Sequence, residues 1–73
     1  MKIVLNGAET EIEAPPEGLT VAALLQRRGV RSVACAVEVN RELAPRRRHG
    51  ETMLREGDEV EIVTLVGGGR GIA

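Results

Sequence analysis

The sequence contains no phenylalanine, tyrosine or tryptophan, so any folded core must be assembled from aliphatic side chains alone. In 73 residues such side chains suffice for one domain with one small core. A chain of this size has little room for an enclosed substrate pocket with its own catalytic groups, which argues against a self-sufficient enzyme. The lack of aromatic rings also removes the stacking platforms on which most modules for single-stranded nucleic acid depend.

The charges are nearly balanced, with ten Lys and Arg against eleven Asp and Glu and a formal net charge of −1. A balanced chain has no overall field that would attract nucleic acid or an anionic membrane. Its apolar runs are far too short to cross a bilayer, and the first residues follow a strand pattern without the apolar segment of a signal peptide. We therefore expect a cytoplasmic protein that is monomeric when free and has proteins as partners.

The single cysteine, Cys35, excludes an intramolecular disulfide and a cysteine-based metal cluster. It alternates with Val33, Val37 and Val39 on one face of a predicted strand, so we expect a small buried hydrophobe and no nucleophilic role. His49 has no second histidine and no cysteine at metal-ligand spacing, which argues against a zinc or catalytic role. The sequence thus predicts no metal site and no catalytic residue.

The first half of the chain predicts a hairpin followed by a helix. Residues 1–5 and 9–13 alternate as strands around Asn6-Gly7, which is a strong hairpin turn signal. The glutamates of the second strand suit an exposed sheet edge and not acid-base catalysis. A short helix should follow, with Thr20 as its N-cap and Gly29 at its C-terminal end.

The second half predicts strands at residues 33–39, 42–44 and 59–66, with an irregular polar connection at 46–50. A hairpin, a crossover helix and further strands can form a mixed sheet with the helix on one face. This is the α+β pattern of a β-grasp, or ubiquitin-like, domain. We assign residues 1–66 to that domain and residues 67–73 to a flexible glycine-rich tail.

The tail reads Gly67-Gly68-Gly69-Arg70-Gly71-Ile72-Ala73 and directly follows an apolar strand. Glycine has no Cβ, so a glycine run can pass through a narrow channel and bring backbone atoms close to a reacting centre. The alternative is an ordinary floppy chain end, which the composition of the tail alone does not exclude.

Four segments of the sequence form a recognisable combination. They are the opening Met1-Lys2-Ile3-Val4-Leu5-Asn6-Gly7, the helix Thr20-Val21-Ala22-Ala23-Leu24-Leu25, the stretch Val37-Glu38-Val39-Asn40 with Leu43-Ala44-Pro45-Arg46, and Glu56-Gly57-Asp58-Glu59-Val60-Glu61-Ile62-Val63 leading into Val66-Gly67-Gly68-Gly69. Together they resemble the ThiS family of sulfur carrier proteins of thiamine biosynthesis. The resemblance rests on their order and spacing and covers residues 1–69.

The resemblance implies that the working group is the carboxylate of Gly69, with Gly68 and Gly67 as an access tail. An adenylyltransferase related to ubiquitin-activating enzymes (ThiF-like) would convert this carboxylate into an acyl-adenylate with ATP and magnesium. Sulfur that originates from a cysteine desulfurase would then give a thiocarboxylate for a thiazole synthase (ThiG-like). The chain itself would be a carrier and not an enzyme, with no bound cofactor.

Relatives in this family commonly end at the diglycine, whereas this sequence continues with Arg70-Gly71-Ile72-Ala73. We expect a precursor that a protease cleaves after Gly69, because the implied chemistry requires a terminal glycine. A cloning or gene-boundary artefact, or a copy that has lost carrier function, would also account for the extension.

Two groups of residues are candidates for partner binding. Val63, Leu65 and Val66 precede the tail and are the expected exposed apolar contacts, although ordinary core positions would also explain them. Arg46 and Arg47 belong to the main concentration of positive charge, which would suit an acidic partner surface or phosphate, or would simply be a solvated loop.

Two other functions stay open on the sequence. The same chemistry serves carriers for molybdopterin, cysteine or methionine synthesis and ubiquitin-like modifiers. Alternatively, the domain is a non-covalent interaction module, for which Gly69 and the residues after it would be dispensable.

Overall fold

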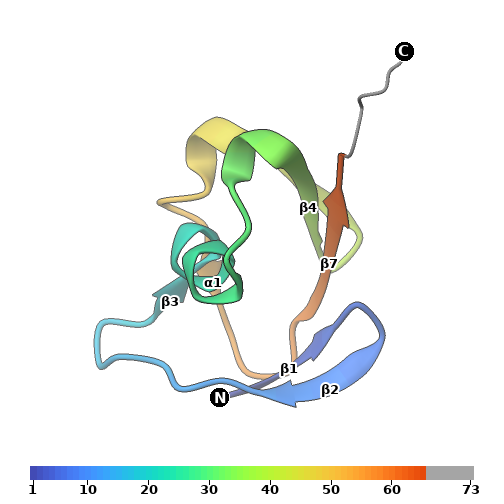
Figure 1. Ribbon diagram of the computed structural model, residues 1–73. Helices are drawn as coiled ribbons and strands as arrows, with labels where there is room; N and C mark the ends of the chain where they lie inside the picture. Colours follow the sequence, from blue (N-terminus) through green and yellow to red (C-terminus); the bar gives the residue numbers. More distant parts are fainter. Residues whose placement is uncertain (66–73) are drawn as a thin grey trace.

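Five strands form a mixed sheet in the order β2-β1-β7-β4-β5, and the helix α1 packs on one side of it (Figure 1). The computed structural model describes residues 1–65, so the predicted domain boundary at 66–67 and the predicted tail lie outside the described residues. The elements are β1 (Lys2–Leu5), β2 (Ala8–Glu11), β3 (Leu19–Thr20), α1 (Val21–Arg28), η1 (Ser32–Ala34), β4 (Cys35–Val39), β5 (Glu42–Ala44), η2 (Arg46–Arg48), β6 (Met53–Leu54) and β7 (Glu59–Thr64). The predicted α+β β-grasp arrangement is confirmed.

Both hairpins of the sheet turn through two residues in the left-handed region. Asn6 and Gly7 have φ values of 50° and 83°, and Asn40 and Arg41 have values of 53° and 70°. Two successive positive φ values define the turn whose twist matches that of the flanking strands. Asn and Gly adopt this conformation readily, whereas Arg41 adopts it at a cost that the surrounding contacts must offset.

The two turn asparagines also attach their hairpins to the central strand β7. The Asn6 side chain accepts a hydrogen bond from the Ile62 amide at 2.7 Å and donates to the Ile62 carbonyl at 3.3 Å. The Asn40 side chain accepts from the Glu59 amide at 3.0 Å and donates to Asp58 Oδ1 at 3.0 Å. Strand β7 is therefore held by side-chain amides in addition to its pairing with β1 and β4.

Free backbone groups at both ends of α1 have hydrogen-bond partners, and the sequence predicts two of these caps. Thr20 Oγ1 accepts a hydrogen bond from the Ala23 amide at 3.1 Å, and Gly29, with φ of 70°, ends the helix and donates to the Gln26 carbonyl. The Val21 amide donates to the Thr52 carbonyl. The predicted N-cap and C-terminal glycine are thus confirmed.

The core lies between α1 and the inner face of the sheet and is entirely aliphatic apart from Cys35. Among its members, side chains of α1 face alternate residues of β1, β4 and β7. The buried residues are Ile3, Leu5, Ile12, Leu19, Val21, Leu24, Leu25, Cys35, Val37, Ala44, Leu54 and Val60. Within residues 1–65, no helix combines the length and the apolar character that crossing a lipid bilayer requires.

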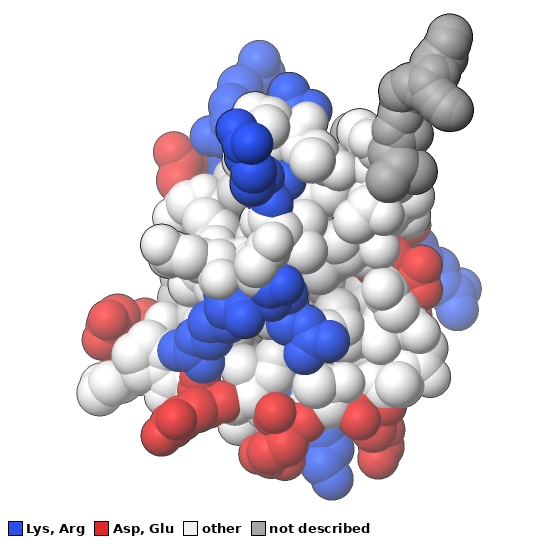
Figure 2. Space-filling view, in the orientation of Figure 1, with Lys and Arg blue, Asp and Glu red and all other residues white. Residues whose placement is uncertain are grey.

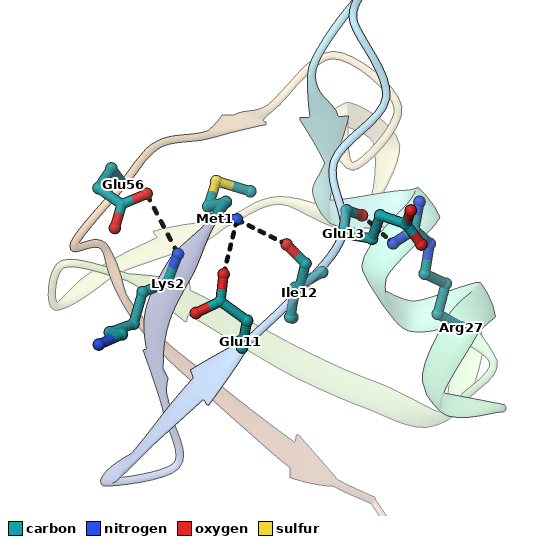
Figure 3. Close-up of polar contacts among 7 residues, drawn as sticks. All are labelled: Met1, Lys2, Glu11, Ile12, Glu13, Arg27 and Glu56. Atoms are coloured by element: carbon teal, nitrogen blue, oxygen red, sulfur yellow. Dashed lines mark hydrogen bonds and ion pairs between the residues drawn. The ribbon is translucent and has the colours of Figure 1, made fainter.

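Polar contacts connect the start of β1 and the segment after β2 to neighbouring parts of the chain (Figure 3). The Met1 ammonium donates to the Ile12 carbonyl at 2.8 Å and to Glu11 Oε2 at 3.3 Å, and the Lys2 amide donates to Glu56 Oε1 at 3.1 Å. Arg27 donates through Nη1 to the Glu13 carbonyl, which connects the helix to the segment after β2. The edge position predicted for this glutamate-rich strand is confirmed.

Several predictions of local structure are wrong. The strand predicted at 59–66 ends at Thr64, so Leu65 lies outside it. Strand β2 ends at Glu11, so Glu13 lies outside it. Val33 belongs to the 3-10 turn η1 and is 59% exposed, because β4 begins only at Cys35. The connection after Pro45 is a second 3-10 turn over residues 46–48, which local i→i+3 bonding favours after a proline.

The fold predicts that truncating Leu24, which is fully buried on α1, lowers the free energy of unfolding by about 2–4 kcal/mol through lost burial and the cavity left behind. Urea unfolding of Leu24→Ala measures this loss. Leu43→Ala is the matched control, because Leu43 is 66% exposed and its truncation should change stability by less than about 0.5 kcal/mol. Equal losses for both variants would contradict the described core.

Candidate functional site: the end of strand β7

Strand β7 directly precedes the glycine-rich segment that we predict from the sequence to be functional. Cys35 of β4 pairs with Thr64, and the Leu65 amide then donates to the Ala34 carbonyl at 2.7 Å. The backbone is therefore fixed by hydrogen bonds up to Leu65. The predicted thiocarboxylate site Gly69, its access residues Gly67 and Gly68, and the predicted contact Val66 lie outside the described residues.

An apolar surface lies on the side of the sheet opposite to α1, next to the end of β7. Val63 and Leu65 are 54% and 53% exposed, which confirms their predicted exposure. Val63 lies directly opposite the half-buried Ala36 on β4, and Leu43 of β5 is 66% exposed. We call Ala36, Leu43, Val63 and Leu65 the outer apolar surface. Its members come from three adjacent strands, so a partner can contact them together.

Sequence reasoning missed Leu43 as a member of this surface. Its neighbour Ala44 is buried and pairs with Val37 on the inner face, so strand alternation places Leu43 on the outer face. The alternation of the short strand 42–44, combined with the burial of Val37, could have indicated that Leu43 is exposed. The pairing that fixes the register involves residues 37–44 across a turn, which the sequence alone indicates only weakly.

The structure brings only one of the two predicted arginines to the end of β7. Arg46 donates through Nε to the Ser32 carbonyl at 3.1 Å and shares with Leu65 a pocket of about 180 Å³. Arg47 is exposed in the same 3-10 turn but does not line this pocket. The lining residues are Cys35, Ala36, Leu43, Ala44, Pro45, Arg46, His49 and Leu65.

Cys35 and His49 are both buried beneath this pocket. Cys35 is 2% exposed, as predicted for a small buried hydrophobe, and its Sγ lies 3.9 Å from the Ser32 carbonyl. His49 is 3% exposed, and its Nε2 lies 2.9 Å from the Ala44 carbonyl. Since a carbonyl can only accept, Nε2 carries the proton in this contact, and Nδ1 has no hydrogen-bond partner in the described part of the chain.

The burial of His49 was not foreseen, because it ends a run of three arginines that reads as a solvated loop. The reason lies in the backbone: the His49 carbonyl accepts from the Ala22 amide at 3.0 Å and so caps the first turn of α1. In residues 1–65, no group of three or more potential ligands could hold a metal ion. The surroundings of Cys35 and His49 therefore indicate packing and loop support.

The family model for ThiS matches residues 3–69, so this chain belongs to the ThiS family. The structure agrees, since a ThiS thiamine biosynthesis protein from Geobacter metallireducens superposes with a TM-score of 0.79 in its crystal form. That pair shares 31% sequence identity over 94% of this chain and 100% of the other. The solution structure of a thiamine biosynthesis protein from the same organism gives a TM-score of 0.78 at 30% identity, over 100% of this chain and 94% of the other.

Three relatives match nearly the whole of this sequence. A thiazole synthase from Paramagnetospirillum magneticum is 42% identical over 69 residues, which are 94% of this chain and 20% of that protein. A thiazole synthase from Magnetococcus marinus is 39% identical over 96% of this chain and 21% of that protein. The uncharacterized protein ycf40 of Porphyra purpurea is 35% identical over 94% of this chain and 93% of its own length. The chain thus spans about a fifth of the length of the two thiazole synthases.

A structural role for His49 predicts that His49→Leu lowers the free energy of unfolding by about 1–3 kcal/mol, because the buried Ala44 carbonyl loses its donor. Thermal unfolding with and without Zn²⁺ measures this. Arg48→Ala, an exposed neighbour, is the control and should have little effect. Stabilisation of the unmodified chain by Zn²⁺, lost in His49→Leu, would instead identify His49 as a metal ligand.

Proposed function

We propose that this chain is a sulfur carrier of thiamine biosynthesis that transports sulfur as a thiocarboxylate on Gly69. The observation that carries the proposal is the match to the ThiS family model over residues 3–69, whose last matched residue is Gly69. The described structure supports it in one respect. Strand β7 ends at the surface, beside exposed apolar residues that a partner can grip.

The chemistry requires activation by a partner, because a carboxylate is a poor electrophile. In the proposed cycle a ThiF-like adenylyltransferase uses ATP and magnesium, joins AMP to the Gly69 carboxylate and releases pyrophosphate. The outer sulfur of a persulfide formed by a cysteine desulfurase then attacks the carbonyl and displaces AMP, which gives an acyl disulfide. A thiol attacks the donor's sulfur of this disulfide, which releases the thiocarboxylate and leaves a disulfide between the thiol and the donor. The carrier contributes no catalytic group to these steps. It supplies a glycine end without bulky side chains and a stiff base that projects it.

Two thiazole synthases contain a segment similar to nearly this whole chain, and this favours the thiamine branch over molybdopterin, cysteine or methionine synthesis. Segments that are joined in one polypeptide in some organisms are good candidates for partners where they are separate. We infer that a ThiG-like thiazole synthase receives the sulfur. The carrier would dock through the outer apolar surface, with Val66, Arg46 and Arg47 as further contacts.

The extension Arg70-Gly71-Ile72-Ala73 follows the last residue of the family match. In the proposed cycle a protease removes it, because the residues after Gly69 keep its carboxyl group in a peptide bond, where it cannot be adenylated. The carrier role predicts that the rate of adenylation depends strictly on the residue at which the chain ends.

To test this dependence, three chains that end at Gly68, Gly69 and Ala73 are compared in pyrophosphate exchange into ATP by the ThiF-like enzyme. The chain that ends at Gly69 should support exchange, and the other two should be slower by about a hundredfold, since misplacing the reacting carboxylate costs about that much. Equal rates for the chains ending at Gly69 and Ala73 would contradict cleavage. Equal rates for all three would contradict a specific role of Gly69.

Docking through the outer apolar surface predicts that Val63→Ala and Leu65→Ala each weaken binding to the thiazole synthase by about fivefold or more, as expected for central apolar contacts worth over about 1 kcal/mol. Isothermal titration calorimetry measures the affinity. Met53→Ala removes a comparably exposed apolar side chain outside this surface and should bind normally. A loss that is as large in the Met53 variant would argue against this docking surface.

A further inference from the structure

The charges of this nearly neutral chain are strongly segregated along its sequence. Residues 26–49 contain seven arginines and two glutamates, whereas the remaining described residues contain two basic and nine acidic side chains. The fold turns this segregation into a surface feature. In Figure 2 most Lys and Arg side chains lie over the top and centre of the view, with others at its right and lower edges, and most Asp and Glu side chains lie along its lower edge.

Four of these arginines come from the residue before η1 and from η2. We call Arg31, Arg46, Arg47 and Arg48 the arginine pole. Arg27 and Arg28 of α1 do not belong to it, because they line a pocket together with Glu11 and Glu13. Arg41, the seventh, lies in the turn between β4 and β5 and pairs with Glu59 at the start of β7, so it does not belong to the pole.

The arginine pole borders the point where β7 ends. Arg31 is the N-terminal flanking residue of η1, whose Ala34 carbonyl accepts the Leu65 amide. Arg46 holds the same turn through the Ser32 carbonyl and lines a pocket together with Leu65. A partner that receives the segment after Leu65 must therefore approach these arginines as well as the outer apolar surface.

Few acidic side chains neutralise the positive charge of the arginine pole. Within residues 1–65, only Arg48 of its four members forms an ion pair, an exposed contact with Glu51 at 3.9 Å. Exposed pairs of this kind contribute little, so the positive charge remains available to a partner. Such a patch mainly accelerates association with a surface of opposite charge and orients the encounter.

Apolar neighbours favour a protein over nucleic acid as the ligand of this pole. Val33 of η1 and Leu65, whose amide donates to the Ala34 carbonyl of the same turn, are 59% and 53% exposed. Arginine beside exposed apolar side chains is typical of protein interfaces. Stacking of bases has no aromatic platform here, because the sequence contains no aromatic residue.

We propose that the arginine pole is a second docking surface, which steers an acidic surface of the thiazole synthase onto the end of β7. This inference rests on the proposed function, since it takes that synthase as the partner. The outer apolar surface and the arginine pole would then both border the end of β7 and have different roles in binding. Apolar contacts would set the lifetime of the complex, and the arginines would set its rate of formation.

The test measures association of the full chain with the thiazole synthase of the same organism by stopped-flow fluorescence, at 50 mM and 500 mM NaCl. Arg31→Glu/Arg47→Glu reverses two exposed arginines for which the described structure gives no side-chain hydrogen bond or ion pair. The matched control is Lys2→Glu/Arg55→Glu, which makes the same change in charge near the opposite end of β7, where the Gly57 amide donates to the Lys2 carbonyl. Circular dichroism verifies that both variants are folded.

At 50 mM NaCl we expect the pole variant to associate about tenfold or more slowly than the unmodified chain, with a much smaller change in dissociation rate. At 500 mM, where the Debye length falls to roughly 4 Å, the rates should converge. The control variant should associate at close to the unmodified rate at both salt concentrations, and so clearly faster than the pole variant at 50 mM.

Equal slowing of both variants would attribute the effect to net charge and overturn the arginine pole. Binding of a single-stranded RNA by the unmodified chain but not by the pole variant, with unchanged association to the synthase, would overturn it in favour of nucleic acid. Thiocarboxylate formation is measured separately on unmodified and pole-variant chains that end at Gly69, at high salt and saturating adenylyltransferase. Conversion of neither chain would count against the proposed function, whereas conversion of both with equal association rates at low salt would overturn the docking inference alone.

Discussion

The pairing of β7 between β1 and β4 is the constraint on which the rest of the molecule depends. This strand is parallel to one neighbour and antiparallel to the other, and the turn asparagines Asn6 and Asn40 attach their hairpins to it. Val60 lies near the start of β7, is almost fully buried and packs in the core beneath α1. Because its hydrogen bonds run on to Leu65, the fold delivers the chain to one defined place on the surface.

The outer apolar surface and the arginine pole both border the end of β7, but they are built differently. Strand alternation produces the first, and the 3-10 turns produce the second. Alternation along β5 and β7 points Leu43 and Val63 away from α1. Arg31 instead precedes η1 and three arginines form η2, and the contact of Arg46 with the Ser32 carbonyl holds the two turns together. A carrier that must be gripped next to its reacting end benefits from both kinds of surface, since one can hold a partner and the other can attract it.

Most of the fold could be predicted from the sequence because its signals are local. The Asn6-Gly7 turn, the Thr20 cap and Gly29 each act within a few residues, and the alternation of β4 and β7 marks the buried face. The errors involve long-range contacts. The burial of His49 depends on its carbonyl reaching Ala22, and the exposure of Val33 depends on where β4 begins to pair with β7, so neither has a sequence signal of its own. At the site, the apolar residues before the tail were predictable from their position, whereas Leu43 required the register of β5.

The most direct test of the account is the intact mass of the chain after incubation with ATP, magnesium, the ThiF-like enzyme, a cysteine desulfurase and a cell extract of the same organism. The account predicts loss of Arg70 to Ala73, followed by a mass increase that corresponds to the replacement of one oxygen by sulfur on the new end. A chain that keeps its full-length mass while the adenylyltransferase is demonstrably active would contradict the carrier function and leave a non-covalent interaction module as the better explanation.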